Sequence, residues 1–147
     1  MKHQSTKDLV SIALAIALIA VGAFIRIMSP YGVPFTLQPL MVMLCSLILR
    51  RYRATVAVLL YLLIGLLGIP IFALGGGPAY VFQPSFAYLL AFIPMSLVIS
   101  FTKSHLPGPQ WVRIAVACLL GELVLYGLAL PYVGFLMRWV LHKDYSL

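Results

Sequence analysis

Acidic side chains are almost missing from this sequence, which has 3 Asp and Glu residues in 147, and charged residues of either sign make up only 9%. A soluble domain carries roughly 25% charged residues. Hydrophobic residues make up 63% of the chain. A chain of this length cannot bury so many apolar side chains in a soluble core, because small domains leave much of their surface wet. The composition therefore predicts an integral membrane protein.

Nucleophilic and metal-binding residues are also scarce. Cys45 and Cys118 each lie in an apolar stretch, without metal or redox spacing, and are interpreted as packing residues. His3, His105 and His142 lie at chain ends or predicted turns, and no nucleophile stands beside a base. We therefore expect a protein that is not an enzyme and that uses no cofactor and no metal.

The excess positive charge, +7 at pH 7, is concentrated at the ends of apolar stretches. Examples are Lys2 and Lys7 at the N-terminus, the cluster from Arg50 to Arg53, and Lys103. Nucleic-acid binders instead gather basic residues on one exposed face, so we expect no nucleic-acid partner. Cytoplasmic loops of membrane proteins are enriched in Lys and Arg. We therefore expect a multi-pass protein of the cell membrane with a cytoplasmic N-terminus.

The chain is interpreted as a single transmembrane domain over residues 1–147, without an internal repeat. We predict an all-α fold with helices at about 9–28, 37–49, 54–69, 86–101 and 111–140. A straight span needs about 20 residues, so the second helix is too short to cross a bilayer unless the preceding loop or a tilt contributes. The first is too long for the apolar part of a signal peptide and is expected to remain in the protein.

Two uncharged loops rich in Pro and Gly interrupt the apolar spans, at Val33–Pro39 and Gly68–Pro84. Irregular backbone near a membrane is tolerated only where protein covers it or a cavity hydrates it. The charge pattern places both loops on the outer side. Together they are interpreted as two halves of a small-molecule pocket.

Candidate ligand-binding groups are found in both loops. Thr36 and Gln38 have side chains that can hydrogen-bond a ligand, although Thr36 is also a suitable helix cap. Gly75, Gly76 and Gly77 allow a ligand to approach the main chain closely. The alternative for these glycines is a flexible hairpin.

Aromatic residues follow the glycines. Tyr80, Gln83 and Tyr88 combine aromatic faces with one amide, which suits a flat, mostly uncharged ligand. The alternative is an aromatic belt at the membrane interface. Glu122 is the one acidic residue within a predicted span, and it is interpreted either as functional or as a packing element.

Small residues recur at spacings of three and four in the first predicted helix, at Ala13, Ala17 and Ala20. Such spacing lets another helix approach closely. We interpret this face as a contact for a partner helix, with lipid exposure as the alternative.

Several segments of the chain together resemble one known family. They are Val33–Gln38, Gly68–Phe72, Gly75–Gly77, Tyr80–Leu90 and the residues Gly121, Tyr126 and Gly127. The chain resembles the biotin transporter family BioY, the substrate-binding S component of energy-coupling factor (ECF) transporters. The resemblance covers nearly the whole chain.

The resemblance implies an ECF S-component-like bundle that captures biotin from outside. Its implied partners are an ECF T subunit, contacted by Ala13 and Ala17, and two cytoplasmic ATPases that drive uptake. The expected ligand-binding residues are Thr36, Gln38, Gly75, Gly76, Gly77, Tyr80, Gln83, Tyr88 and Tyr126.

The chain departs from the family pattern at its C-terminal end. The family has six membrane helices, and the last carries an Asp and a Lys, three residues apart, that help to bind the ligand. Only five helices are predicted here, without matching positions, so we expect a chain truncated before the last helix that binds biotin weakly. The alternatives are an S component for another vitamin, such as thiamine or riboflavin, and a truncated, non-transporting membrane protein.

Overall fold

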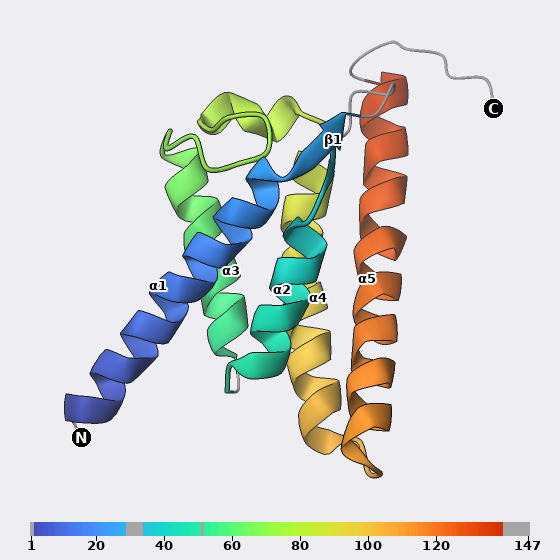
Figure 1. Ribbon diagram of the computed structural model, residues 1–147. Coiled ribbons are helices and arrows are strands. Elements are labelled where there is room, and N and C mark those ends of the chain that lie inside the picture. Colours follow the sequence, from blue (N-terminus) through green and yellow to red (C-terminus); the bar gives the residue numbers. More distant parts are fainter. Residues whose placement is uncertain (1, 29–33, 51, 140–147) are drawn as a thin grey trace.

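The computed structural model describes residues 2–28, 34–50 and 52–139 (Figure 1). Val33 of the first predicted loop, Arg51 of the basic cluster and Val140 at the predicted end of the fifth helix lie outside the described residues. The elements in chain order are α1 (Lys2–Phe24), β1 (Arg26–Met28), β2 (Pro34–Thr36), α2 (Gln38–Ile48), α3 (Arg53–Leu66), the 3-10 helix η1 (Pro78–Phe82), α4 (Phe86–His105) and α5 (Gln110–Trp139). The predicted helical fold is therefore observed within these ranges.

Helix α4 lies at the centre of the bundle. It packs against α5, α2 and α3, while α1 packs against α2 and α3 (Figure 1). The side chains of Tyr61, Phe92, Met95 and Ile99 are fully buried between these helices. Large apolar side chains also cover the outside of the bundle, including Leu123, which is 62% exposed. Such an apolar surface suits contact with lipid rather than water.

Three helices are long and apolar enough to cross a membrane, judged over the described residues: Thr6–Phe24 within α1, Phe86–His105 and Gln110–Leu136 within α5. Helices α2 and α3 have 11 and 14 residues and are shorter than a full span. Short helices leave non-helical backbone near membrane depth, which must be covered by protein. This non-helical backbone, formed by the β strands and the long loop between α3 and α4, lies at one end of the bundle (Figure 1).

The end of the first helix differs from the prediction. We expected helix to about Met28, but α1 ends at Phe24 and Arg26–Met28 forms β1. This strand pairs antiparallel with β2, with Ile27 opposite Phe35. The apolar character of these residues was interpreted as helix, whereas pairing with β2 satisfies their backbone instead. No short-range signal distinguishes these two outcomes for so few residues.

The predicted C-terminal ends of two further helices also differ from the observed ends. The third helix was expected to reach about Ile69 but ends at Leu66, because Gly68 has a positive φ of 109° and Pro70 follows. The fourth helix was expected to end near Phe101 but continues to His105, whose ring nitrogen Nδ1 lies 3.0 Å from the Phe101 carbonyl oxygen. Polar residues at the end of that helix were interpreted as loop.

Close helix contacts depend on two glycines within helices. A Cβ added at Gly121 of α5 would lie 2.6 Å from Cγ1 of Ile99 in α4. A Cβ added at Gly22 of α1 would lie 2.8 Å from Cγ of Met41 in α2. A polar contact adds to this packing, since the Ser96 hydroxyl donates to the Thr55 hydroxyl at 2.9 Å between α4 and α3.

Candidate ligand-binding site

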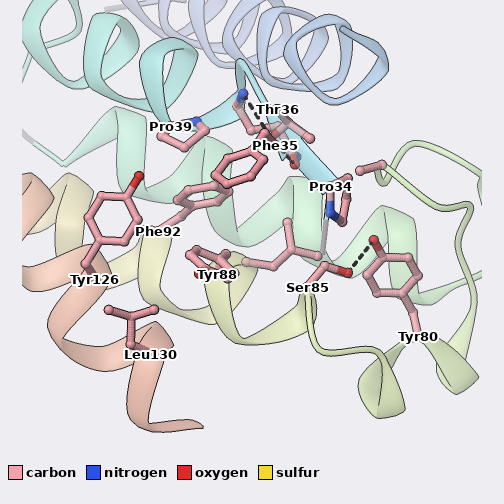
Figure 2. A pocket seen from close by; sticks show the side chains of 13 residues that line it. Pro34, Phe35, Thr36, Pro39, Tyr80, Ser85, Tyr88, Phe92, Tyr126 and Leu130 are labelled. Atoms are coloured by element: carbon pink, nitrogen blue, oxygen red, sulfur yellow. Dashed lines mark hydrogen bonds between the residues drawn. The ribbon is translucent and has the colours of Figure 1, made fainter. Parts of the chain in front are cut away.

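A cavity of about 290 Å³ lies at the end of the bundle where β2, the start of α2 and the start of α4 meet (Figure 2). Its lining comes from separate parts of the chain: Pro34, Phe35, Thr36, Gln38, Pro39, Ala73, Tyr80, Ser85, Tyr88, Leu89, Phe92, Tyr126 and Leu130. The two Pro/Gly loops therefore do contribute to one cavity, and α4 and α5 complete it.

The lining formed by the described residues is mostly apolar and contains no charged side chain. Its polar groups are hydroxyls and one amide, from Thr36, Gln38, Ser85 and the three tyrosines. Small-molecule sites are typically of this kind, with a few polar groups that orient the ligand within an apolar surface. The cavity is at the lower end of the roughly 300–1,000 Å³ range of such sites. This chemistry suits a compact ring system with few hydrogen-bonding groups.

Gln38 is held in the cavity wall by interactions at both ends. Its backbone N–H donates to the Thr36 hydroxyl at 3.4 Å, and Pro39 follows at the first turn of α2, where its missing N–H costs nothing. Its side-chain nitrogen Nε2 donates to the Tyr61 hydroxyl at 2.7 Å. Among the described residues, the side-chain oxygen Oε1 has only a long contact of 3.5 Å, with the Thr36 hydroxyl. That oxygen can therefore accept a hydrogen bond from a ligand.

Tyr61 connects this wall to the glycine-rich loop. Its side chain is fully buried, and its hydroxyl donates to the Ile71 carbonyl oxygen at 2.7 Å. A buried hydroxyl without a partner would be costly, so Tyr61 fixes both Gln38 and the loop. Tyr61 was not singled out from the sequence. A lone tyrosine within an apolar helix was the available signal, because a buried tyrosine usually finds a hydrogen-bond partner.

The glycine-rich loop folds back on the end of α3. Phe72 and Gly75 exchange two backbone hydrogen bonds, of 2.8 and 3.2 Å, and the Gly77 N–H donates to the Gly65 carbonyl oxygen at 2.7 Å. Gly75 and Gly77 have φ angles of 122° and 102°, a region that side chains disfavour. A Cβ added at Gly76 would lie 2.3 Å from the Ile69 carbonyl oxygen. These glycines thus support the shape of the loop itself.

Three aromatic rings pack against one another beside the cavity, edge-on or tilted and not stacked. The Phe72 ring lies 5.4 Å from that of Tyr61 and 4.7 Å from that of Tyr80, measured between centroids. The Tyr80 hydroxyl accepts a hydrogen bond of 3.0 Å from the Ser85 hydroxyl (Figure 2). It also accepts a longer one of 3.4 Å from the Leu74 N–H. The loop and the start of α4 are joined through this one hydroxyl.

Tyr88 and Tyr126 form the wall between α4 and α5 (Figure 2). Their ring centroids are 6.3 Å apart and the rings are nearly perpendicular, at 81°. Edge-to-face pairs of this kind are favourable. Tyr126 is 45% exposed, so the bundle covers it only in part.

The structure separates the residues that were predicted to bind a ligand into two groups. Thr36, Gln38, Tyr80, Tyr88 and Tyr126 line the cavity. Gly75, Gly76, Gly77 and Gln83 are not among the lining residues, and the Gln83 side chain is exposed. The glycines were proposed for close main-chain approach and Gln83 for its side-chain amide, but none of the four contributes to this cavity. Sequence reasoning also missed Ser85, Phe92 and Leu130, which have no distinguishing local pattern.

Three other predicted residues lie outside the cavity. Ala13 and Ala17 are exposed on α1, whereas Ala15 of the same helix is buried against the bundle. Glu122 is half-buried in α5, one helical turn before Tyr126, and does not line the cavity. Within the described ranges, no group of three or more His, Cys, Asp or Glu residues is arranged to hold a metal ion.

Comparisons with known proteins give consistent matches. A family model described as the BioY family matches residues 1–146. A protein of Lysinibacillus sphaericus named "Probable biotin transporter BioY" is 43% identical over 133 residues, which cover 90% of this chain and 67% of that protein. The "Biotin transporter BioY" of Thermotoga maritima is 34% identical over 131 residues, covering 88% of this chain and 75% of its own length.

A solved structure shows the same fold. The crystal structure of an S component for biotin from an ECF-type ABC transporter matches with a TM-score of 0.82 and 24% sequence identity. The match covers 92% of this chain and 75% of the other. The predicted ECF S-component-like helical bundle is thus confirmed at the level of the fold.

Proposed function

Because this chain belongs to the BioY family, we propose that it is a membrane substrate-binding subunit for biotin uptake. The observation that carries the proposal is the uncharged, aromatic-lined cavity, to which both Pro/Gly loops contribute. The proteins named as biotin transporters support it, since their similarity extends across the chain segments that build this cavity.

Biotin has groups that fit the lining. Its ureido ring both donates and accepts hydrogen bonds, and the Gln38 side-chain oxygen and the Thr36 hydroxyl offer complementary partners. Its apolar thioether ring suits the faces of Tyr88, Tyr126 and Phe92. None of the described lining residues offers a cation to the carboxylate of biotin, so we propose that the ring system enters first and that the tail points out of this cavity.

Other vitamins fit the same cavity less well. Thiamine has a fixed positive charge, and none of the described lining residues is a carboxylate that could offset its desolvation. Riboflavin has a larger ring system than biotin, and the cavity is only about 290 Å³. Size and charge therefore both favour the bicyclic ring of biotin.

We also propose that this subunit works with an ECF T subunit and two cytoplasmic ATPases. The exposed alanines of α1 support this partner, because small residues allow close contact between helices. The Lys/Arg pattern supports an orientation with the N-terminus in the cytoplasm and the cavity on the outer side.

Isothermal titration of the purified chain with biotin, thiamine and riboflavin tests the ligand assignment. Gln38→Leu removes the amide from the cavity wall, and Gln83→Leu is the matched control because it removes an exposed amide outside the cavity. We expect Gln38→Leu to weaken biotin binding roughly tenfold or more, since a buried ligand group then loses its partner. We expect Gln83→Leu to bind as the unmodified chain does.

Two results would contradict the proposal, provided that the variants fold. Thermal unfolding of both variants shows whether the fold is retained. If the folded Gln38→Leu variant binds biotin normally, this cavity is not the binding site. If thiamine or riboflavin binds more tightly than biotin, the ligand assignment is wrong.

A further inference from the structure

A second pocket lies at the other end of the bundle, where α2 and α4 end and α3 begins. Its volume is about 590 Å³. It is lined by Ser46, Ile48, Leu49, Arg50, Arg53, Ser100, Lys103 and Ser104. The two pockets share no lining residue, and this one is basic and hydroxyl-rich where the first is uncharged.

The cations of this basic pocket are only partly neutralised. Arg53 forms an ion pair of 2.7 Å with Asp8 of α1. The ammonium group of Lys103 donates to the Leu47 carbonyl oxygen at the end of α2, a neutral partner. Arg50 has no ion pair within the part of the chain that the structure describes. Three cations therefore face one carboxylate, which leaves a net positive field.

One of the three serine hydroxyls of the pocket lacks a hydrogen-bond partner among the described residues. Ser46 donates to the Val42 carbonyl oxygen at 2.7 Å, and Ser104 donates to the Ser100 carbonyl oxygen at 2.6 Å. The Ser100 side chain is 5% exposed, and among the described residues its hydroxyl oxygen has no hydrogen-bond partner. Buried polar side chains nearly always have a partner, so an unpartnered one calls for an explanation.

The start of α3 adds to the positive field. Arg53 is its first residue, and the preceding cap residue, Tyr52, makes no side-chain hydrogen bond to the helix. The N-terminus of a 14-residue helix carries a partial positive charge and unsatisfied N–H groups. Such an end favours an anion nearby.

Apolar side chains border the cations. Ile48 is 67% exposed at the rim, and Leu49 lies beside it. A free inorganic anion gains nothing from apolar neighbours, whereas a lipid presents a charged headgroup next to acyl chains. Basic pockets between membrane helices are known to take anionic lipid headgroups.

We propose that the basic pocket binds a phosphate group, and that the apolar rim makes an anionic phospholipid its source. Arg50 and Lys103 pair with the phosphate oxygens, and the Ser100 hydroxyl donates to one of them. The positive charge alone would orient the chain in the membrane. It does not account for the Ser100 hydroxyl, which lines the pocket and has no partner among the described residues, whereas a bound phosphate would supply one.

Thermal unfolding of the purified, delipidated full chain in detergent tests this proposal. The probes are short-chain phosphatidylglycerol, short-chain phosphatidylcholine and inorganic phosphate, the last compared with chloride at equal ionic strength. Two variants alter the pocket, Arg50→Gln and Ser100→Ala. The matched control, Arg26→Gln, removes the same charge from exposed β1 at the opposite end of the bundle.

We expect phosphatidylglycerol to raise the unfolding temperature, while phosphatidylcholine does not. The half-saturating concentration of phosphatidylglycerol should rise roughly tenfold in Arg50→Gln and in Ser100→Ala, because each variant loses a hydrogen bond to a charged group. Arg26→Gln should respond as the unmodified chain does. Ser100→Ala without lipid should be as stable as the unmodified chain or more so, because it removes an unsatisfied buried group.

Several results decide between sources or overturn the proposal. A specific response to inorganic phosphate that equals the lipid response keeps the phosphate site and assigns a free anion to it. If the half-saturating concentration of phosphatidylglycerol rises equally in Arg26→Gln and Arg50→Gln, the lipid is attracted by diffuse charge and there is no specific site. No rise in unfolding temperature with either phosphatidylglycerol or inorganic phosphate would overturn the proposal.

Discussion

The side-chain amide of Gln38 donates a 2.7 Å hydrogen bond to the hydroxyl of Tyr61, two residues that lie 23 positions apart in the sequence. The same hydroxyl donates to the Ile71 carbonyl oxygen at 2.7 Å. One buried hydroxyl thus joins the start of α2, the middle of α3 and the glycine-rich loop. The cavity wall and the loop behind it are positioned by this relay.

Replacing Tyr61 with Phe is expected to weaken both stability and ligand binding. The change leaves the Gln38 amide and the Ile71 carbonyl without their shared partner, and each buried group left unsatisfied costs about 1–3 kcal/mol. Thermal unfolding and biotin titration measure the two effects. Tyr52→Phe removes a hydroxyl from an exposed tyrosine and is expected to change neither. Unchanged stability and binding in Tyr61→Phe would show that the relay is dispensable.

Gly65→Ala is expected to displace Phe72 and destabilise the loop. An added Cβ would lie 2.1 Å from the Phe72 ring, well within van der Waals contact. Overpacking of this kind costs about 1–3 kcal/mol. Gly127→Ala is the matched control on α5, since its Cβ would meet no atom within 4 Å. Chemical denaturation compares the two variants, and equal stability would mean that Phe72 relocates at no cost.

Substituting both Ala13 and Ala17 with Leu is expected to reduce transport while biotin binding survives. Both residues are exposed on α1 and away from the cavity, so the added bulk affects only a docked partner. Pull-down of the T subunit and uptake in cells that contain all ECF components measure the effect. Ala115→Leu, at an exposed alanine on α5, serves as the control. An unchanged pull-down in the double variant would place the interface elsewhere.

Cysteine labelling in intact cells tests the orientation. Gln83→Cys marks the end with the ligand cavity, and Tyr52→Cys marks the end with the basic pocket, in a background with Cys45 and Cys118 replaced. Gly76 is unsuitable, because its added side chain would clash with the Ile69 carbonyl. An impermeant thiol reagent should label residue 83 and not residue 52, because basic residues favour the cytoplasmic side. The reverse labelling pattern would invert the proposed topology.

The helical membrane fold could be predicted from composition and the length of apolar runs, because lipid requires every backbone group to be satisfied within a segment. Helix ends were less predictable. Arg26–Met28 became a strand because β2 was available to pair with it, and Pro34–Thr36 lies several residues along the chain. Nothing within either three-residue segment encodes that pairing.

The candidate site, too, could be predicted from the sequence only in part. The sequence by itself determined that uncharged, hydrogen-bonding loops interrupt apolar helices, and it singled out Thr36, Gln38 and Tyr80. Only the tertiary structure decided that Gln83 is exposed and does not line the cavity, and that Tyr61 holds Gln38. It also decided that Ser100 is buried at the opposite end without a partner among the described residues. The reason is physical. Residue type and spacing fix which groups are polar and which helix face is apolar, but the packing of distant segments fixes which polar group finds a partner.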